Sequence, residues 1–387
     1  MTDFAYLAQG KLHVKVGDAP VRVIDSRFGG SVRQRALEMQ KRNEWKTQGR
    51  GAQFMRGGVL WGVRDEDAEG MPIAVTGVTG NCSGAEMAYT LETPEVSGIF
   101  LVSDGGRQEN RLFHTADFRV GQLHSCGEKL AFVVRHKGGG SNIGVMNADG
   151  TGFAEVTEGD TIDLAPRWVP GSRHEIVFQC AGIGRDQAGA WAGQAPFTVE
   201  KLDLESGQLT TLAEDPESDL IAPQVAADGA LYYIRRPYRH PRAKVSAWRA
   251  LVDFVLFPFR LLYALFQFLN FFTVRYTGKT LTTANDVRQR QADIRQMMVW
   301  GNLMDAERAN RVKGDDDAPP LVPDTWKLIR QSERGQEEIA QGVLCFDLLN
   351  DGSVLFSNGS AIFCVDTNGK KERLHKDAFV QQVIALP

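Results

Sequence analysis

Histidine and cysteine are the residues of this chain best suited to metal binding or nucleophilic chemistry, but their spacing forms no recognised motif. Seven histidines lie along the 387 residues without an H-x-x-x-H or H-E-x-x-H pair, and five cysteines lie far apart without a C-x-x-C pair. Zinc and dithiol sites use such close pairs. His114, His124 and His136 would reach one site only if the fold brings distant segments to a common channel. We therefore expect reduced cysteines, and no catalytic residue, metal site or cofactor.

Motifs for a serine nucleophile or for phosphate binding are also missing from the sequence. The segment G-N-C-S-G at 80–84 has flanking glycines but is not G-x-S-x-G, and no glycine-rich run ends in G-K-[ST]. Three consecutive aspartates at 315–317 are more typical of a solvated loop than of a metal site. A net charge of −4 lacks the basic excess of nucleic-acid-binding domains. These patterns favour a binding protein over an enzyme, with no nucleic-acid partner.

Short strand-like runs separated by tight turns make up most of the chain. Examples are G-E-K-L-A-F-V-V-R-H at 127–136 and L-I-A-P-Q-V-A-A-D-G-A-L-Y-Y-I at 220–234. Asp and Gly favour the turns, whereas β-branched and aromatic residues favour the strands. The turn residues Asp104, Asp149 and Asp203 recur at intervals of about 50 residues, a period typical of four-stranded propeller blades.

Two adjoining motifs resemble a known repeat family. The run V-M-N-A-D-G-T-G at 145–152, followed by D-L-A-P-R-W-V-P-G at 163–171, resembles the repeats of TolB-type, WD-like β-propellers. The resemblance is clearest at 127–234 and 342–374. It implies an all-β, six-bladed β-propeller with helical insertions, in which N- and C-terminal strands complete one blade and close the ring. It also implies a scaffold for protein interaction more often than an enzyme. A hydrolase or lyase with a site in the central channel is the alternative.

Two stretches do not fit the blade pattern, so we assign residues 1–236 and 324–387 to the propeller and the rest to insertions. The first insertion, at about 27–51, has a helix-forming composition and is basic. It is either a solvated helix packed on the propeller or a docking surface for an acidic protein partner or for lipid headgroups. Its candidate partner-binding residues are Arg33, Arg35, Lys41, Arg42 and Trp45.

The second insertion, at 237–323, contains the most apolar stretch of the chain. Residues 250–274 include seven phenylalanines and only two charged residues, Asp253 and Arg260. Pro258 predicts a break between two helices, at 247–257 and 259–274. The few polar residues fall on one face of a helical wheel, which predicts an amphipathic, membrane-associating segment at 247–275.

Topology decides between crossing the membrane and lying on it. If the strands on either side of the insertion belong to one blade, a single crossing leaves the chain on the wrong side, so we expect a monotopic attachment. The expected membrane-binding residues are Trp248, Leu251, Phe254, Phe257, Phe259, Leu262, Phe266, Leu269 and Phe272. The expected contacts to anionic lipid are Arg235, Arg236, Arg239, Arg242 and Lys244. The alternatives are a homo-oligomer assembled through the hydrophobic helix, and burial against the propeller.

The first residues lack a basic segment followed by an apolar one, so we expect no signal peptide. Together these patterns predict a cytoplasmic, peripheral protein on the inner face of the cell membrane. Its partners would be anionic lipid of the inner leaflet and a protein that the sequence does not identify.

Overall fold

The computed structural model describes residues 2–47, residues 73–238 except 83, 188 and 190, residues 298–299 and 302–303, and residues 318–386. The chain divides into two compact units, one formed by Met1–Tyr238 and Met304–Pro387 and the other by Arg239–Leu303. In the second unit, the short strands β19 (Met298–Val299) and β20 (Asn302–Leu303) pair antiparallel. The predicted helices at 247–257 and 259–274 lie outside the described residues.

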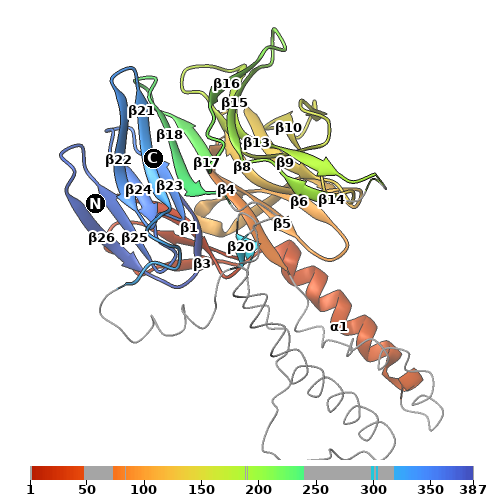
Figure 1. Ribbon diagram of the computed structural model, residues 1–387. Coiled ribbons are helices and arrows are strands. Elements are labelled where there is room, and N and C mark those ends of the chain that lie inside the picture. Colours follow the sequence, from red (N-terminus) through yellow and green to blue (C-terminus); the bar gives the residue numbers. More distant parts are fainter. Residues whose placement is uncertain are drawn as a thin grey trace, which may run out of the picture. The chain divides into compact units, whose positions relative to one another are not determined.

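The first unit is built from antiparallel sheets, which confirms the predicted all-β class (Figure 1). One sheet contains strands from both ends of the chain, in the order β27 (Val380–Ala385), β1 (Phe4–Ala8), β2 (Lys11–Lys15) and β3 (Arg22–Ile24). Within it, β27 pairs antiparallel with β1.

Three further sheets have four strands each. The first consists of β4 (Ala74–Cys82), β5 (Ala85–Glu92), β6 (Ser97–Ser103) and β7 (Gln108–Thr115), with the 3-10 turn η3 (Asp104–Gly106) between the last two. The second consists of β17 (Ser218–Val225), β18 (Leu231–Pro237), β21 (Lys327–Ser332) and β22 (Gly335–Gln341). The third consists of β23 (Cys345–Leu348), β24 (Val354–Ser357), β25 (Ala361–Val365) and β26 (Lys371–Lys376).

The remaining strands form a nine-stranded sheet that contains two runs. The first run is β8 (Arg119–Ser125), β9 (Lys129–Arg135), β10 (Ser141–Asn147) and β11 (Ala154–Glu155). The second is β12 (Thr161–Trp168), β13 (Glu175–Arg185), β15 (Thr198–Asp203) and β16 (Leu209–Ala213), with β14 (Trp191–Gln194) beside β13. One parallel pair, Ser141 with Ile162, joins the two runs.

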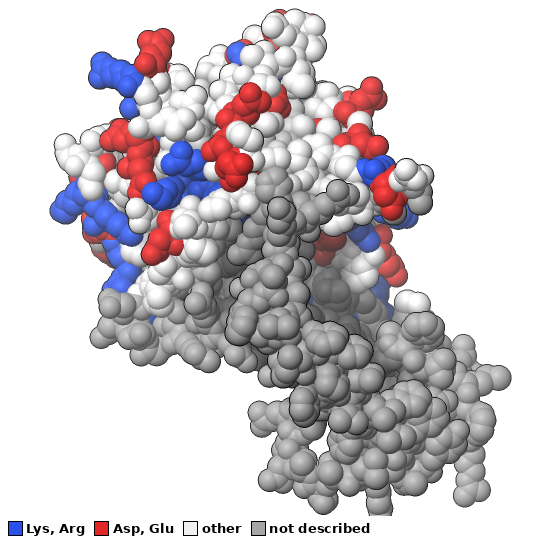
Figure 2. All heavy atoms as spheres, viewed as in Figure 1, with Lys and Arg blue, Asp and Glu red and all other residues white. Residues whose placement is uncertain are grey.

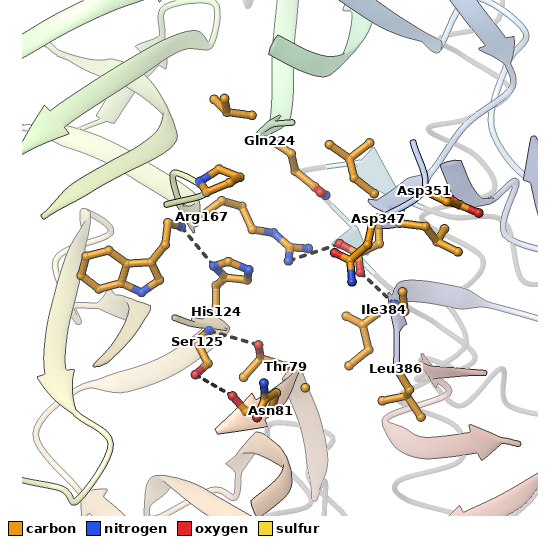
Figure 3. A pocket seen from close by; sticks show the side chains of 18 residues that line it. Thr79, Asn81, His124, Ser125, Arg167, Gln224, Asp347, Asp351, Ile384 and Leu386 are labelled. Atoms are coloured by element: carbon orange, nitrogen blue, oxygen red, sulfur yellow. Dashed lines mark hydrogen bonds and ion pairs between the residues drawn. The ribbon is translucent and has the colours of Figure 1, made fainter. Parts of the chain in front are cut away.

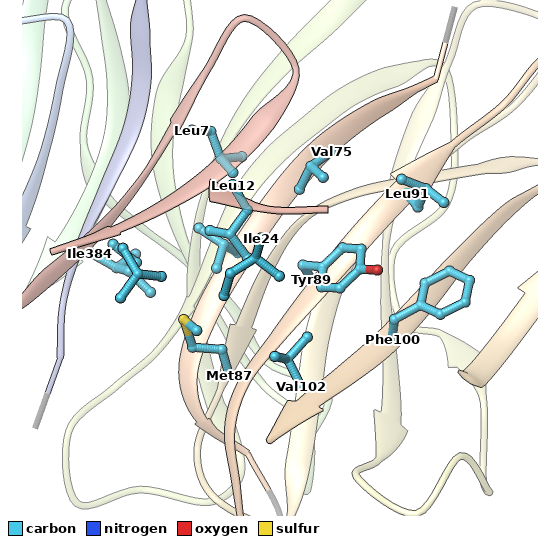
Figure 4. Packing of buried hydrophobic residues seen from close by; sticks show 13 residues of the cluster. Leu7, Leu12, Ile24, Val75, Met87, Tyr89, Leu91, Phe100, Val102 and Ile384 are labelled. Atoms are coloured by element: carbon cyan, nitrogen blue, oxygen red, sulfur yellow. The ribbon is translucent and has the colours of Figure 1, made fainter. Parts of the chain in front are cut away.

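The apolar core lies between neighbouring sheets, and β9 shows why. Successive side chains of a strand point to opposite faces of its sheet. Leu130, Phe132 and Val134 pack into a cluster with residues of β4, β5 and β6. Ala131 and Val133 pack into another cluster with residues of β12 and β13. The continuous apolar run of β9 is therefore buried on both faces, as sheets stacked side by side require. Figure 4 shows a third cluster, formed by side chains from β1 to β6 and from β27.

Each group of four successively paired strands has one strand at its inner edge, and these inner strands contact one another in succession. β4 contacts β8, β8 contacts β12 and β12 contacts β17. β17 in turn contacts β23, β23 contacts β27, and β27 contacts β4. We call these six the inner strands. In five of them, β4, β8, β12, β17 and β27, the pairing with the next strand of the same sheet shifts register, as at a β-bulge.

The two insertions leave this framework at defined points. The first contains the helix α1 (Arg27–Thr47), as its composition predicts. Its N-terminus is capped from β7, because the backbone N–H groups of Arg27 and Phe28 donate to the Glu109 carboxylate at 2.8 and 3.0 Å. Within the described ranges, no helix combines the length and apolar character needed to cross a bilayer.

The second insertion begins and ends within one sheet. β18 pairs antiparallel with β21, with Arg235 opposite Lys327. The chain between them therefore leaves from the second strand of a sheet and returns as its third, as the sequence predicts.

A glycine allows β4 and β8 to approach each other closely, and replacing it tests this packing. A Cβ on Gly77 would lie 2.6 Å from the backbone nitrogen of Gln122, whereas a Cβ on Gly182 of β13 would meet nothing within 4 Å. We expect Gly77→Ala to lower the free energy of unfolding by about 1–3 kcal/mol through overpacking. The control Gly182→Ala should change it by about 0.5 kcal/mol or less. Urea unfolding of both variants checks this, and equal midpoints would contradict it.

Candidate functional site

A cavity of about 590 Å³ lies where the inner strands meet (Figure 3). Its lining includes side chains from all six inner strands: Thr79 and Asn81 of β4, His124 and Ser125 of β8, Arg167 and Trp168 of β12, Gln224 of β17, Asp347 of β23, and Ile384 of β27. The cavity is within the usual size range of ligand pockets. It belongs entirely to the first unit.

Backbone bulges position three of the polar side chains. Gln122, Ala165 and Ala222 have left-handed backbone conformations, with φ of 46°, 53° and 53°. Each stands two residues before a lining residue, namely His124, Arg167 or Gln224. Register shifts occur at the same places in β8, β12 and β17. The bulges therefore direct equivalent side chains of successive runs into the cavity.

Glutamine side chains of neighbouring runs hold two of these bulges. The Oε1 atom of Gln122 accepts a hydrogen bond from the Ala165 backbone N–H at 2.9 Å. Gln179 Oε1 accepts one from the Ala222 N–H at 2.7 Å. These bonds satisfy backbone donors that a bulge removes from the strand ladder.

His124 is fixed in one tautomer by a backbone contact. Its Nδ1 accepts a hydrogen bond from the Trp168 N–H at 3.0 Å. Because a backbone N–H can only donate, Nδ1 carries no proton, and the proton of the neutral ring is on Nε2. Burial, with a smaller effect from the Arg167 charge, lowers the pKa of His124 well below its ordinary value. The ring is therefore a neutral hydrogen-bond donor near neutral pH.

An ion pair spans the cavity between β12 and β23. Arg167 Nη1 lies 3.5 Å from Asp347 Oδ1, and the two side chains are 15% and 14% exposed. Asp347 Oδ2 also accepts the Ala385 N–H at 2.8 Å, which ties in β27. Burial raises the pKa of Asp347, and the Arg167 charge opposes that shift. Gln224 Nε2 donates to the Phe346 carbonyl oxygen at 2.9 Å, so β17 is joined to β23 as well.

The arrangement offers hydrogen-bond donors rather than an activated nucleophile. His124 cannot accept a proton at Nδ1 without losing its backbone partner, and Asp347 already accepts the Ala385 N–H and is paired with Arg167. Ser125 Oγ donates to the Asn81 carbonyl oxygen rather than to a base. Among the lining residues described here, no hydroxyl is paired with a general base in the manner of a catalytic triad. The geometry suits binding of a polar ligand.

The histidines considered together in the sequence are separated by the fold. Only His124 lines the cavity. His114 is exposed on β7, and His136 Nε2 lies 2.9 Å from Glu155 Oε2. In the described part of the chain, no three His, Cys, Asp or Glu side chains form a group able to hold a metal ion.

Sequence reasoning missed Arg167, Gln224 and Asp347. A signal for the first two exists, because A-P-R at 165–167 and A-P-Q at 222–224 are the same bulge in consecutive repeats. The residue after the proline is the one that faces the cavity. Asp347 follows no bulge, and no comparable pattern marks it.

One of the basic residues expected to contact lipid, Arg236, is buried in the protein instead. Arg236 is 6% exposed, and its Nε lies 2.9 Å from Asp219 Oδ2. Its guanidinium also stacks on the Trp326 ring, 5.0 Å from the ring centroid. The assignment of Arg236 to lipid contact is therefore wrong, because its side chain is buried against Asp219 and Trp326. Arg235 is half-buried, and Arg239, Arg242 and Lys244 lie outside the described residues.

The other predicted site residues are placed only in part. Arg33 and Arg35 are exposed on α1, and Arg35 Nε donates to the Ser31 carbonyl oxygen at 3.3 Å. The side chains of Lys41, Arg42 and Trp45 lie outside the described residues. So do all of the expected membrane-binding residues from Trp248 to Phe272.

Comparison with known proteins concerns the fold. A chain of a nidogen/laminin complex is similar to this protein with a TM-score of 0.52 at 7% identity, with 100% of this chain and 99% of that one covered. TolB from Acinetobacter baumannii has a TM-score of 0.49 at 11% identity, with 99% of this chain and 65% of that one covered. A TolB from Agrobacterium tumefaciens has a TM-score of 0.43 at 13% identity, with coverage of 82% and 91%.

The chain resembles TolB-type β-propellers. At these identities the likeness describes the fold alone and says nothing of activity. No protein-family model matches the sequence, and no curated protein matches it.

The buried His124 generates a pH prediction. The unfolded chain binds a proton at the ordinary histidine pKa of 6.5, whereas the folded chain excludes it. This contribution to stability is therefore lost as the pH falls below about 6.5, with a slope of at most about 1.4 kcal/mol per pH unit. His124→Asn keeps an acceptor for the Trp168 N–H but cannot titrate. We expect unfolding free energies measured between about pH 5 and 7 to fall more steeply with acid for the wild type. Identical slopes would contradict the prediction.

The Asp219–Arg236 pair generates a second prediction. Arg236→Gln leaves a buried carboxylate without its cation and removes the stacking on Trp326, so we expect a loss of about 3 kcal/mol. The neighbouring Arg235→Gln is the matched control and should cost about 0.5 kcal/mol or less. Chemical denaturation of both variants measures the difference. A small effect at both positions would show that the pair contributes little.

Proposed function

We propose that this protein is a non-catalytic binding scaffold, a six-bladed β-propeller attached to the inner face of the membrane by the segment between β18 and β21. The blades would be the six four-stranded runs. The succession of inner-strand contacts, which returns from β27 to β4, supports both the blade count and closure.

Burial of the sheet shared by the two termini also supports closure. Ala5 and Leu7 of β1 pack with residues of β4, β5 and β6, while Phe4 and Tyr6 pack with residues of β23, β24 and β25. The terminal sheet is thus covered on both faces by different neighbouring sheets. A closed propeller removes open sheet edges in this way.

The pairing of β18 with β21 is the observation that carries the membrane proposal. The chain leaves and re-enters one sheet, so both ends of the insertion stay on the same side of a bilayer. Its apolar stretch at 250–274 would therefore contact the bilayer surface and return without crossing it. Each Phe or Leu side chain buried fully in lipid contributes on the order of 1.5–3 kcal/mol, so a few are sufficient for attachment.

The distribution of charge indicates which residues would attract anionic lipid. Figure 2 shows acidic and basic side chains interspersed over the described residues of one face. Attraction to anionic lipid would therefore come from the run of Arg239, Arg242 and Lys244 beside the apolar stretch. On the propeller, Arg33 and Arg35 of α1 would be available to an acidic protein partner.

A propeller hydrolase or lyase is the second candidate, and the polar cavity favours it. Arg167, Asp347 and His124 approach from three different runs, as catalytic groups of a channel enzyme would. The scaffold proposal is preferred because these groups form no nucleophile and general-base pair: Arg167 and Asp347 pair with each other, and His124 Nδ1 accepts the Trp168 backbone N–H.

Flotation with liposomes tests the attachment. The full chain is compared with a variant in which residues 246–276 are replaced by a Gly/Ser linker of equal length, so that β18 and β21 can still pair. We expect the full chain to float with liposomes containing phosphatidylserine and the variant to remain in the dense fractions.

Two controls make this result interpretable. Matching melting temperatures would show that the linker variant is folded. Triple replacement of Arg239, Arg242 and Lys244 by Gln should reduce flotation most at low salt, by about 1 kcal/mol per charge. A full chain that stays in the dense fractions would contradict membrane attachment, and a change in its mass on linker replacement would identify an oligomer interface instead.

A further inference from the structure

The cavity between the inner strands presents hydrogen-bond donors on one side. Arg167 of β12 and His124 of the adjacent strand β8 both line it. Figure 3 shows the Arg167 side chain extending between His124 and Asp347. A ligand that fits this side must supply acceptors.

The His124 donor is held by geometry. Since Nδ1 is occupied by the Trp168 N–H, the ring can offer the cavity only its Nε2–H. The same backbone bond fixes the ring plane, so the donor is oriented before any ligand arrives.

The guanidinium of Arg167 has donors to spare. The guanidinium carries five N–H groups, and of these only Nη1 is seen near a carboxylate, at 3.5 Å from Asp347 Oδ1, a distance longer than a charge-assisted hydrogen bond. Asp347 is in addition committed to the Ala385 N–H. The pair is therefore loose enough for Arg167 to bind a second acceptor without losing its first.

Trp168 has a buried donor without a partner. Its indole Nε1 has no hydrogen-bond partner among the described residues, although the side chain is only 4% exposed. The indole packs with Ala131, Val133 and Phe178 in the core beside the cavity, so Trp168 is not one of the donors that a ligand would meet. The far side of the cavity, at Ile384 and Leu386, is apolar (Figure 3).

We propose that this cavity binds a carboxylate, from a small organic acid or from a peptide C-terminus, through Arg167 and the Nε2–H of His124. The apolar group attached to that carboxylate would pack on Ile384 and Leu386. This site is independent of the membrane segment, because every residue named here lies in the first unit.

Charge selects a monoanion over a phosphate. Arg167 is the one cation among the lining residues, and Asp347 already compensates part of its charge. Asp351 at the exposed rim, whose carboxylate accepts the Ser353 N–H at 2.8 Å, repels a second negative charge. A dianion would therefore be under-compensated.

Ligand-observed NMR on the full chain tests the proposal with defined probes. Hexanoate is compared with hexanamide, and the peptide Ala-Leu-Leu with its C-terminal amide. We expect saturable binding of at least one carboxylate and an affinity about tenfold lower for its amide. Preference for hexanoate would indicate a small-molecule ligand, and preference for the peptide would indicate a chain terminus.

The variants distinguish recognition from folding. The double variant Arg167→Met, Asp347→Asn keeps the net charge and removes both halves of the pair, and it should abolish carboxylate binding. His124→Asn keeps the Trp168 contact and should weaken binding about tenfold. Arg173→Gln, at an exposed arginine outside the cavity, is the control and should leave binding unchanged. Melting temperatures would confirm that each variant is folded.

Three results would overturn the proposal: equal binding of acid and amide, undiminished binding to the double variant, or no saturable binding of either carboxylate to the wild type. Inorganic phosphate binding as tightly as hexanoate would overturn the preference for a monoanion. None of these results depends on flotation, so failure here leaves the membrane proposal standing and the reverse also holds.

Discussion

Burial of each sheet on both faces is the constraint on which the rest of the structure depends. Strands such as β9 and β1 direct alternate apolar residues into two separate clusters, one on either side. A sheet of this kind is stable only between two neighbours, since an uncovered face would expose several apolar side chains to water. The same requirement brings a C-terminal strand beside an N-terminal one.

Close packing of the inner strands explains why a site exists at their meeting point. β4 and β8 approach so closely that Gly77 has no room for a side chain. The bulges that accommodate this crowding also turn His124, Arg167 and Gln224 toward the cavity. The same backbone bulges thus accompany the close packing of the inner strands and direct side chains into the cavity. The residue that follows each bulge determines which functional group lines the cavity.

Much of the fold could be predicted from the sequence, because strand patterns and turn residues are local signals. The helix beginning at Arg27 and the return of the chain from the second insertion into one sheet were accessible in this way. The site was not, because Arg167 and Asp347 are separated by 180 positions and meet only through the arrangement of the sheets. Arg236 was misassigned for a similar reason, since a run of basic letters does not reveal which side chains of a strand face Asp219.

The long connection between β18 and β21 has an entropic consequence. A flexible chain as long as residues 238–326 costs about 2.5 kcal/mol more to close than a five-residue hairpin, because the cost rises only with the logarithm of length. The contact of Arg236 with Trp326 joins the two ends of that connection and offsets part of this cost. Further lengthening adds little, since each doubling costs only about 0.6 kcal/mol. The junction therefore tolerates insertion of a guest segment of almost any size, and the content of the loop can evolve independently of the sheets that hold it.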